Sequence, residues 1–147
     1  MTEINYKKLS GAPKYEYELL ADTTIYTPTV NYGKWCACSK KDPNQVLISA
    51  DGHYFTVHAG YTWDGCTCAP DCDWNIRASL FHDAMYQTKK QKDSDVKVAE
   101  WSEIDGIFRQ IMKEDGANLF QRNLYYYAVR TFGSLWRMNK LDTVVIK

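Results

Sequence analysis

The first half of the chain has the pattern of β-strands, most clearly where Phe55, Val57 and Ala59 alternate with Tyr54, Thr56 and His58. Four segments rich in Tyr, Thr, Ile and Val predict strands: residues 15–20, 23–30, 46–49 and 54–59. Pro28 indicates that the second of these lies at a sheet edge, because proline cannot donate to a ladder. Asp51-Gly52, between the last two segments, is a strong hairpin signal. The pattern predicts antiparallel strands over residues 1–60.

The pattern changes after residue 60. Gly60, Gly65 and Pro70 indicate an irregular loop over residues 61–73. From residue 74 the apolar positions recur with helical spacing, as in Trp74, Ala78, Phe81 and Met85.

We expect three helices within residues 74–140. The first begins after Asp73 as N-cap, the second covers about 96–113 and ends at Asp115-Gly116, and the third covers about 117–138. Residues 143–146 could add a last strand. The sequence therefore predicts one α+β domain over residues 1–147, with N-terminal antiparallel strands followed by three packed helices.

Composition narrows the possible functions. The 147 residues carry 18 basic and 18 acidic side chains, so net charge gives no reason to expect nucleic-acid binding. No apolar run approaches the roughly 20 residues of a membrane span, and we expect no transmembrane segment. Aromatic residues make up 14% of the chain, which favours a protein that docks on a partner. The run Tyr125-Tyr126-Tyr127 points in three directions on a helix, so at least one ring should be exposed.

The first twenty residues resemble no secretion signal, so we expect synthesis and folding in a cytosol. The chain has five cysteines: Cys36, Cys38, Cys66, Cys68 and Cys72. An odd number without a signal argues against a disulfide framework. Two Cys-x-Cys pairs could bind zinc, but zinc sites usually use Cys-x-x-Cys, and residues i and i+2 of a strand share a face. We therefore expect buried thiols rather than a zinc site.

The helix after residue 74 carries the most distinctive chemistry. His82 and Tyr86 are four residues apart and share a face, with Asp83 beside them, in an otherwise apolar stretch. On the second helix, Asp105 is the acid best placed to face inward, and antiparallel packing would bring it to His82. A carboxylate that orients an imidazole is the arrangement of a general base. Asp83 would then project toward the Trp63-Asp64-Gly65 loop as a ligand for a hard cation. The alternative is a structural pair that ties helix to helix.

Three motifs resemble the active-site core of secreted phospholipase A2: Gly65-Cys66-x-Cys68, His82-Asp83-x-x-Tyr86 and Asp105-x-x-Phe108. The resemblance implies that His82 is the base, with Tyr86 and Asp105 orienting it. It also implies a Ca²⁺ site made by Asp83 and backbone carbonyls of the loop that includes Trp63 and Gly65. The chain departs from that family at Ala78-Ser79, where a cysteine should precede the histidine, and at Ala69-Pro70-Asp71, which replaces a glycine-rich calcium loop.

A longer pattern is similar to a family of small uncharacterised proteins of tailed phages and prophages. It comprises Tyr17-x-Leu19-Leu20, Val57-x-Ala59-Gly60-Tyr61-x-Trp63-Asp64-Gly65, Ala78 to Tyr86, Asp105-x-x-Phe108-x-x-x-Met112 and Tyr127-Ala128-Val129-Arg130-x-Phe132-Gly133. The resemblance implies a phage origin, without an established activity. Its members do not need cysteines in the Trp-Asp-Gly loop, which argues against zinc at Cys66 and Cys68.

Arg130 is an unusual charge in an apolar helix, and it could pair with a buried acid such as Asp64 or Asp83 or bind a phosphate head group. Two hypotheses remain open. The first is a metal-assisted, ester-type hydrolase that acts on lipid or cell-envelope material during phage infection or lysis. The second is a non-catalytic phage protein, associated with the virion or with a host component, in which the His-Asp-Tyr-Asp cluster is structural. Its partners would be other phage proteins or a host envelope component.

Overall fold

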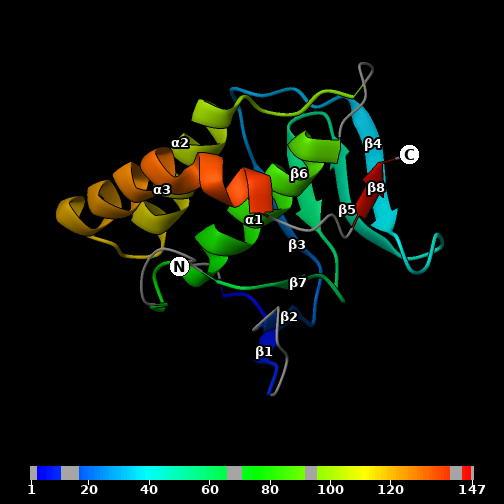
Figure 1. Ribbon diagram of the computed structural model, residues 1–147, viewed down its shortest axis with the longest axis horizontal. Coiled ribbons are helices and arrows are strands. Elements are labelled where there is room, and N and C mark those ends of the chain that lie inside the picture. Colours follow the sequence, from blue (N-terminus) through cyan, green and yellow to red (C-terminus); the bar gives the residue numbers. More distant parts are fainter. Residues whose placement is uncertain (1–2, 11–16, 66–70, 92–95, 140–143, 147) are drawn as a thin grey trace.

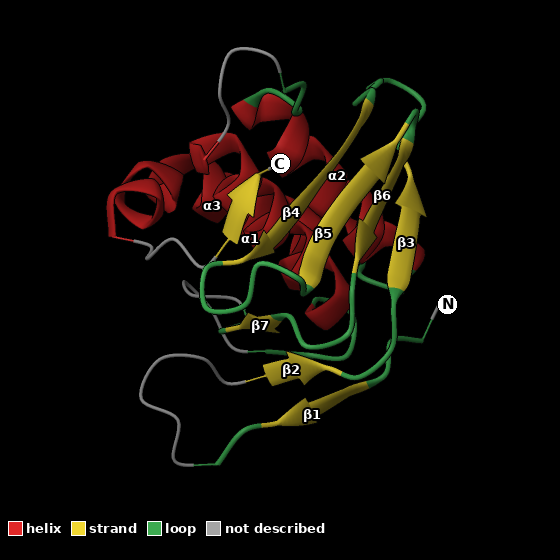
Figure 2. Cartoon of the chain, turned by 90° about the vertical axis from the view of Figure 1, so that its right-hand side faces the viewer, coloured by secondary structure: helices red, strands yellow, loops and turns green. Residues whose placement is uncertain are grey.

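The computed structural model describes residues 3–10, 17–65, 71–91, 96–139 and 144–146, with the backbone alone for 133–139 and 144–146. It is an α+β fold, as the sequence predicts: two antiparallel sheets are followed by three helices. Figure 2 shows the larger sheet in front of the helices, with the smaller sheet at one end.

The smaller sheet has the order β1-β2-β7. Its strands are β1 (Tyr6–Lys8), β2 (Tyr17–Leu19) and β7 (Thr62–Trp63). Tyr17 of β2 lies opposite Trp63 of β7, and their ring centroids are 5.4 Å apart. The expectation of an irregular loop over 61–73 is therefore wrong at β7, because a two-residue strand is too short to show alternation.

The larger sheet has the order β3-β6-β5-β4-β8. Its strands are β3 (Thr23–Tyr26), β4 (Lys34–Ser39), β5 (Val46–Asp51), β6 (Tyr54–Val57) and β8 (Val144–Ile146). The hairpin between β5 and β6 is confirmed, and Gly52 takes the left-handed φ of 60° in its turn. The edge position of β3, indicated by Pro28, is confirmed as well.

Strand β4 carries the first Cys-x-Cys pair, and the sequence segments rich in β-branched residues did not include it. Its register with β5 shifts between Ala37 and Cys38, which is the signature of a β-bulge. Cys38 is buried, whereas Cys36 is only half-buried. The expectation that both thiols are buried on one face is thus met by Cys38 alone, because the bulge breaks the period of two.

The helices are α1 (Ile76–Gln91), α2 (Trp101–Glu114) and α3 (Leu119–Asn139). The prediction that Asp73 caps the first helix is wrong, because the carbonyl of Asn75 accepts the first helical bond, from Ser79. The second helix begins at Trp101 rather than near residue 96. A capping box formed by Glu100 and Glu103 sets this start by binding backbone N–H groups that have no helical partner.

Helix α1 lies between the larger sheet and the other two helices (Figure 1). Fourteen of its sixteen residues, from Ile76 to Lys89, are buried, including seven polar or charged ones. Helix α2 packs on α1, and α3 packs on α2. Among the described helices, none is long and apolar enough to cross a membrane. Because α1 is buried, its polar side chains need hydrogen-bond partners within the protein.

Candidate functional site

Asp105 lies in the middle of α2, where its side chain is 0% exposed. Its Oδ1 lies 2.8 Å from Nε2 of His82 and accepts a hydrogen bond of 2.7 Å from the hydroxyl of Tyr86. Its Oδ2 accepts a bond of 3.1 Å from Nη1 of Arg130. We call these four residues the Asp105 network. The predicted contact between His82 and Asp105 is confirmed, and all three helices contribute to the network.

The charge of Asp105 fixes the direction of the bond to His82. Burial alone would raise the pKa of the Asp105 carboxyl, but the hydrogen bonds and charges of its three partners, His82 foremost, outweigh burial and lower that pKa. The carboxyl is therefore ionised at neutral pH and can only accept. It follows that Nε2 of His82 carries the proton that it donates to Asp105.

Aromatic packing holds the imidazole in place. The ring centroid of His82 lies 4.1 Å from that of Tyr86 and 5.0 Å from that of Phe108. Tyr86 in turn meets the edge of Trp101 at 4.9 Å. Tyr86 is 1% exposed, whereas the side chain of His82 retains 8% exposure. The rings thus fix the position of the imidazole within the protein interior.

Arg130 lies on α3, and 40% of its side chain is exposed. The two suggested partners, Asp64 and Asp83, are wrong, because the recorded ion pair of Arg130 is with Asp105. One nitrogen of the guanidinium enters the network while the rest of the group lies at the surface. The guanidinium is therefore a fixed positive charge at the surface, joined to the imidazole of His82 through Asp105.

The Trp63-Asp64-Gly65 segment contacts α1 one turn before Asp83. The indole nitrogen of Trp63 donates a bond of 3.0 Å to the hydroxyl of Ser79, which shares a helix face with Asp83. Asp83 is 2% exposed, Trp63 is 0% exposed, and Asp64 is half-buried. The segment is thus held against α1 one turn before Asp83.

Gly65 closes this segment with a left-handed φ of 73°. A Cβ atom at this position would lie 2.5 Å from Oδ1 of Asp71, whose other carboxylate oxygen accepts a bond of 2.7 Å from Tyr17. Both the backbone angle and the neighbouring carboxylate exclude a side chain here. The sequence suggested Gly65 as part of a cation loop, and the structure shows that this glycine makes room for an acidic side chain.

Within the described part of the chain, no group of three or more His, Cys, Asp or Glu side chains is arranged to hold a metal ion. Cys66 and Cys68 lie outside the described residues, as does Ala69-Pro70 of the loop. Cys72 is half-buried, in the turn before α1.

Two buried cations of α1 make ionic contacts that were not anticipated from the sequence. Arg77, near the start of α1, makes bonds of 3.0 to 3.3 Å to both carboxylate oxygens of Asp115, and one of 2.8 Å to Glu114. Lys89, near the end of α1, lies 5.3 Å from the Trp101 ring and 3.3 Å from Glu100. Both cations join α1 to an end of α2. In the sequence, each was visible only as a charged residue in a helix whose burial from Ile76 to Lys89 the pattern did not predict.

A family model described as a protein of unknown function, DUF1353, matches residues 43–129. The chain belongs to the DUF1353 family. The matched region includes His82, Tyr86 and Asp105 and ends one residue before Arg130. The search of curated proteins and the search of solved structures each found no match. The family is uncharacterised, as the sequence resemblance implied. Membership of the family therefore does not identify an activity for these residues.

Proposed function

We propose that this DUF1353 protein is an ester-type hydrolase in which His82 acts as the general base and Asp105 orients it. The supporting observation is the fully buried, ionised Asp105, whose Oδ1 holds Nε2 of His82. A carboxylate in this position fixes the ring tautomer and stabilises the imidazolium that forms when the ring takes a proton.

The residues would divide the reaction as follows. Nδ1 of His82 removes a proton from water, and the resulting hydroxide attacks the carbonyl carbon of an ester. Tyr86 and Asp105 keep the ring in place through the bonds at Oδ1. The exposed part of the Arg130 guanidinium attracts a negatively charged group of the substrate. The leaving alcohol takes its proton from the imidazolium, which restores the neutral base.

A pair of substitutions at His82 tests the proposal. His82→Gln places an amide N–H where Nε2 lies, so it keeps a donor to Asp105 and removes only the base. The assay follows hydrolysis of p-nitrophenyl butyrate and of phosphatidylglycerol vesicles by the full chain, with products identified by mass spectrometry. We expect wild-type turnover of at least one substrate class and a loss of at least about 100-fold in His82→Gln.

The outcome also depends on the fold of the variant, which thermal unfolding measures in parallel. Equal activity of wild type and His82→Gln, or no hydrolysis by either, would refute the role of His82 as base. A matched control is His58→Gln, because His58 lies on the larger sheet and hydrogen-bonds Ser49 and Asp22 rather than the Asp105 network. This control should keep full activity.

The narrower part of the proposal is a calcium ion held by the carboxylate of Asp83 and backbone carbonyls near Trp63 and Gly65. Hard oxygen donors suit Ca²⁺, which would polarise the substrate carbonyl. The bond between Trp63 and Ser79 supports it by placing the segment beside the turn that precedes Asp83. If Asp83 binds calcium, CaCl2 should raise the melting temperature of the wild type and leave that of Asp83→Asn unchanged. MgCl2 should raise the melting temperature of neither protein. A phage origin and an envelope substrate rest on the resemblance alone and stay predictions.

A second candidate function has its own observation: α3 exposes large apolar side chains. Phe120 is 75% exposed, Tyr127 66% and Leu124 55%, and their spacing of four and three residues puts them on one face. Under this hypothesis the protein docks on a phage or host component and the Asp105 network only joins the helices. Phe120→Ser with Tyr127→Ser would then abolish association with the particle or envelope fraction and leave the melting temperature unchanged. Retained association would exclude this function.

A further inference from the structure

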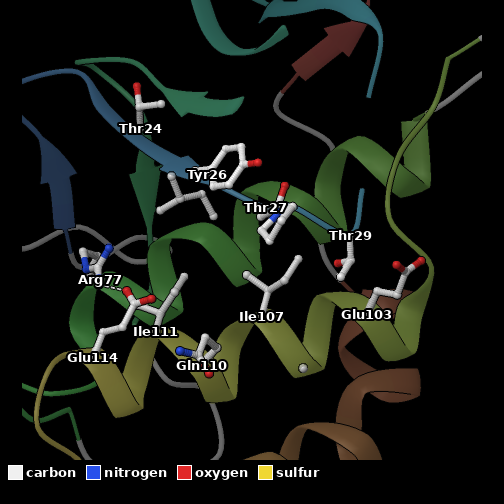
Figure 3. Close-up of a pocket in the computed structure, with 13 residues that line it drawn as sticks. Thr24, Tyr26, Thr27, Thr29, Arg77, Glu103, Ile107, Gln110, Ile111 and Glu114 are labelled. Carbon is white, nitrogen blue, oxygen red and sulfur yellow. Dashed lines mark hydrogen bonds and ion pairs between the residues drawn. The ribbon is translucent and has the colours of Figure 1, made fainter. Parts of the chain in front are cut away.

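A groove separates the edge strand β3 from helix α2. Its cavity measures about 620 Å³. One wall is the strand and the turn after it, residues 24–29, and the other is the exposed side of α2 (Figure 3). None of the four members of the Asp105 network lines it. The groove is therefore a second candidate site, independent of the proposed hydrolase.

The strand presents unused backbone groups to this groove. Thr27 N–H donates to the carbonyl of His53, and Thr27 stands opposite His53 in the register between β3 and β6. Hydrogen-bonded pairs alternate in an antiparallel ladder, so Ile25 is also paired, with Phe55. The N–H and C=O groups of Thr24 and Tyr26 consequently point away from β6. Among the described residues no strand lies on that side of β3, so these groups face the groove.

The opposite wall has a gap in its side chains at Gly106. This glycine is in the interior of α2, is exposed, and has no atom within 4 Å of where its Cβ would lie. A glycine inside a helix is destabilising and here no packing within the described structure requires it. It leaves the helix backbone open to close approach by another chain.

The charges along the groove are acidic. Glu103 and Glu114 stand toward its two ends in Figure 3. The cation in the lining, Arg77, pairs with both Glu114 and Asp115, so these three side chains keep one net negative charge, and the Glu114 side chain is still 50% exposed. Eleven residues of helix separate the two glutamates, or about 17 Å, which corresponds to about five residues of extended chain.

We propose that this groove binds an extended, basic peptide segment, about five residues long, which adds to β3 as a sixth strand. Its backbone pairs with Thr24 and Tyr26, which is the mode of recognition known as β-augmentation. Lysine or arginine side chains near its two ends meet Glu103 and Glu114. Residues i and i+4 of a strand share a face, so one face of the peptide carries both charges.

The test uses the full chain and labelled peptides. The probe is fluorescein-labelled Lys-Val-Thr-Val-Lys, with Glu-Val-Thr-Val-Glu and a backbone N-methylated form of the basic peptide as controls. We expect the basic peptide alone to bind, with a Kd below about 1 mM by fluorescence anisotropy. In the complex, amide hydrogen exchange at Thr24 and Tyr26 slows at least about tenfold, while exchange at Ile25 stays unchanged because its amide is already paired.

Two variants on α2 complete the test. Gly106→Trp fills the groove and should weaken binding at least about tenfold, whereas Ser102→Trp, an exposed position outside the lining, should not. Binding of the acidic or N-methylated peptide as tightly as the basic one overturns the proposal, as does absence of binding. Self-association of the protein through β3, seen by sedimentation with protection of the same two amides, assigns the edge to a second copy and also overturns it.

Discussion

Replacing Asp105 with alanine or with asparagine separates the contribution of its buried acceptor from that of its charge. Oδ1 contacts both His82 and Tyr86, which are themselves buried, whereas Oδ2 contacts only Arg130. Asparagine can keep an oxygen in the place of Oδ1 and puts an amide in the place of Oδ2. Alanine removes both acceptors. The two variants therefore differ at His82 and Tyr86, not at Arg130.

The magnitudes follow from the exposure of each partner. In Asp105→Ala the Tyr86 hydroxyl, on a residue 1% exposed, and Nε2 of His82 lose their acceptor in a site that water barely reaches. Breaking such a buried charged cluster costs about 3–5 kcal/mol. In Asp105→Asn the group that loses its partner is Arg130, whose side chain is 40% exposed and can be hydrated. That variant should cost only about 1–2 kcal/mol.

Urea unfolding, followed by tryptophan fluorescence and by far-UV circular dichroism, measures both free energies. Coincident transitions with equal m-values would show that the variants change stability rather than the unfolded state. Asp51→Asn, at an exposed position on β5, is the control and should change the free energy of unfolding by less than about 0.5 kcal/mol. If Asp105→Ala and Asp105→Asn were equally destabilised, the different roles assigned to Oδ1 and Oδ2 would be refuted.

Three further outcomes are expected. The pKa of Asp105 is lowered in the folded protein, so its ionised form stabilises the fold above the unfolded pKa of about 3.9. This stability is lost as pH falls through the folded value, and the advantage of wild type over Asp105→Asn in urea should therefore shrink as pH falls below about 4. Gly65→Asn should lower the free energy of unfolding, measured thermally, by more than about 2 kcal/mol, because its Cβ would meet the Asp71 carboxylate. The control Gly52→Asn, also at a left-handed φ but with open space around it, should lower it by less than about 1 kcal/mol. Equal losses in the two variants would contradict the steric argument. Arg77→Met should lower the free energy of unfolding in urea by about 3–5 kcal/mol, because it leaves Asp115 buried without its cation. Adding Asp115→Leu to this variant should restore part of that loss. Additive losses from the two substitutions would show that Arg77 and Asp115 do not stabilise each other.

The sequence predicted the elements whose pattern is local. The hairpin around Asp51-Gly52 and the end of α2 at Asp115-Gly116 each rest on turn chemistry within a few residues. The contact between His82 and Asp105 was also predictable, because Asp105 was the acid nearest to the apolar stripe of its helix. The β-bulge in β4 was not, because it depends on pairing with β5 and β8 rather than on the residues of the strand alone.

The partner of Arg130 could have been predicted from the sequence by a simple geometric argument. Helices α2 and α3 are joined by a short connection, residues 115–118, and such a helical hairpin brings together residues equally far from its centre. Asp105 lies ten residues before Asp115, where the connection begins, and Arg130 lies twelve residues after Asn118, where it ends, so the two fall within about one helical turn of each other. The assignment to Asp64 or Asp83 overlooked this symmetry. The burial of polar residues on all faces of α1 could not be predicted in this way, because it depends on which other elements cover each face of that helix.

The location of the Asp105 network makes its purpose testable by removing it as a unit. Apolar side chains surround it, and replacing a buried ionic cluster with apolar residues of similar volume is often neutral or stabilising by about 1–4 kcal/mol. A network kept only for stability should therefore be replaceable. We expect the triple variant His82→Leu, Tyr86→Phe, Asp105→Leu to unfold with a free energy within about 2 kcal/mol of wild type, because Arg130 can turn to water.

The same triple variant should lose hydrolysis completely if His82 is the base. A stable but inactive triple variant, beside an unstable Asp105→Ala, would mean that the polar residues are retained for chemistry and that their mutual contacts only compensate for their burial. A triple variant destabilised by more than about 5 kcal/mol would instead show that the three helices depend on this network to find their register. The hydrolase proposal would then lose the argument that these residues serve a purpose beyond the fold.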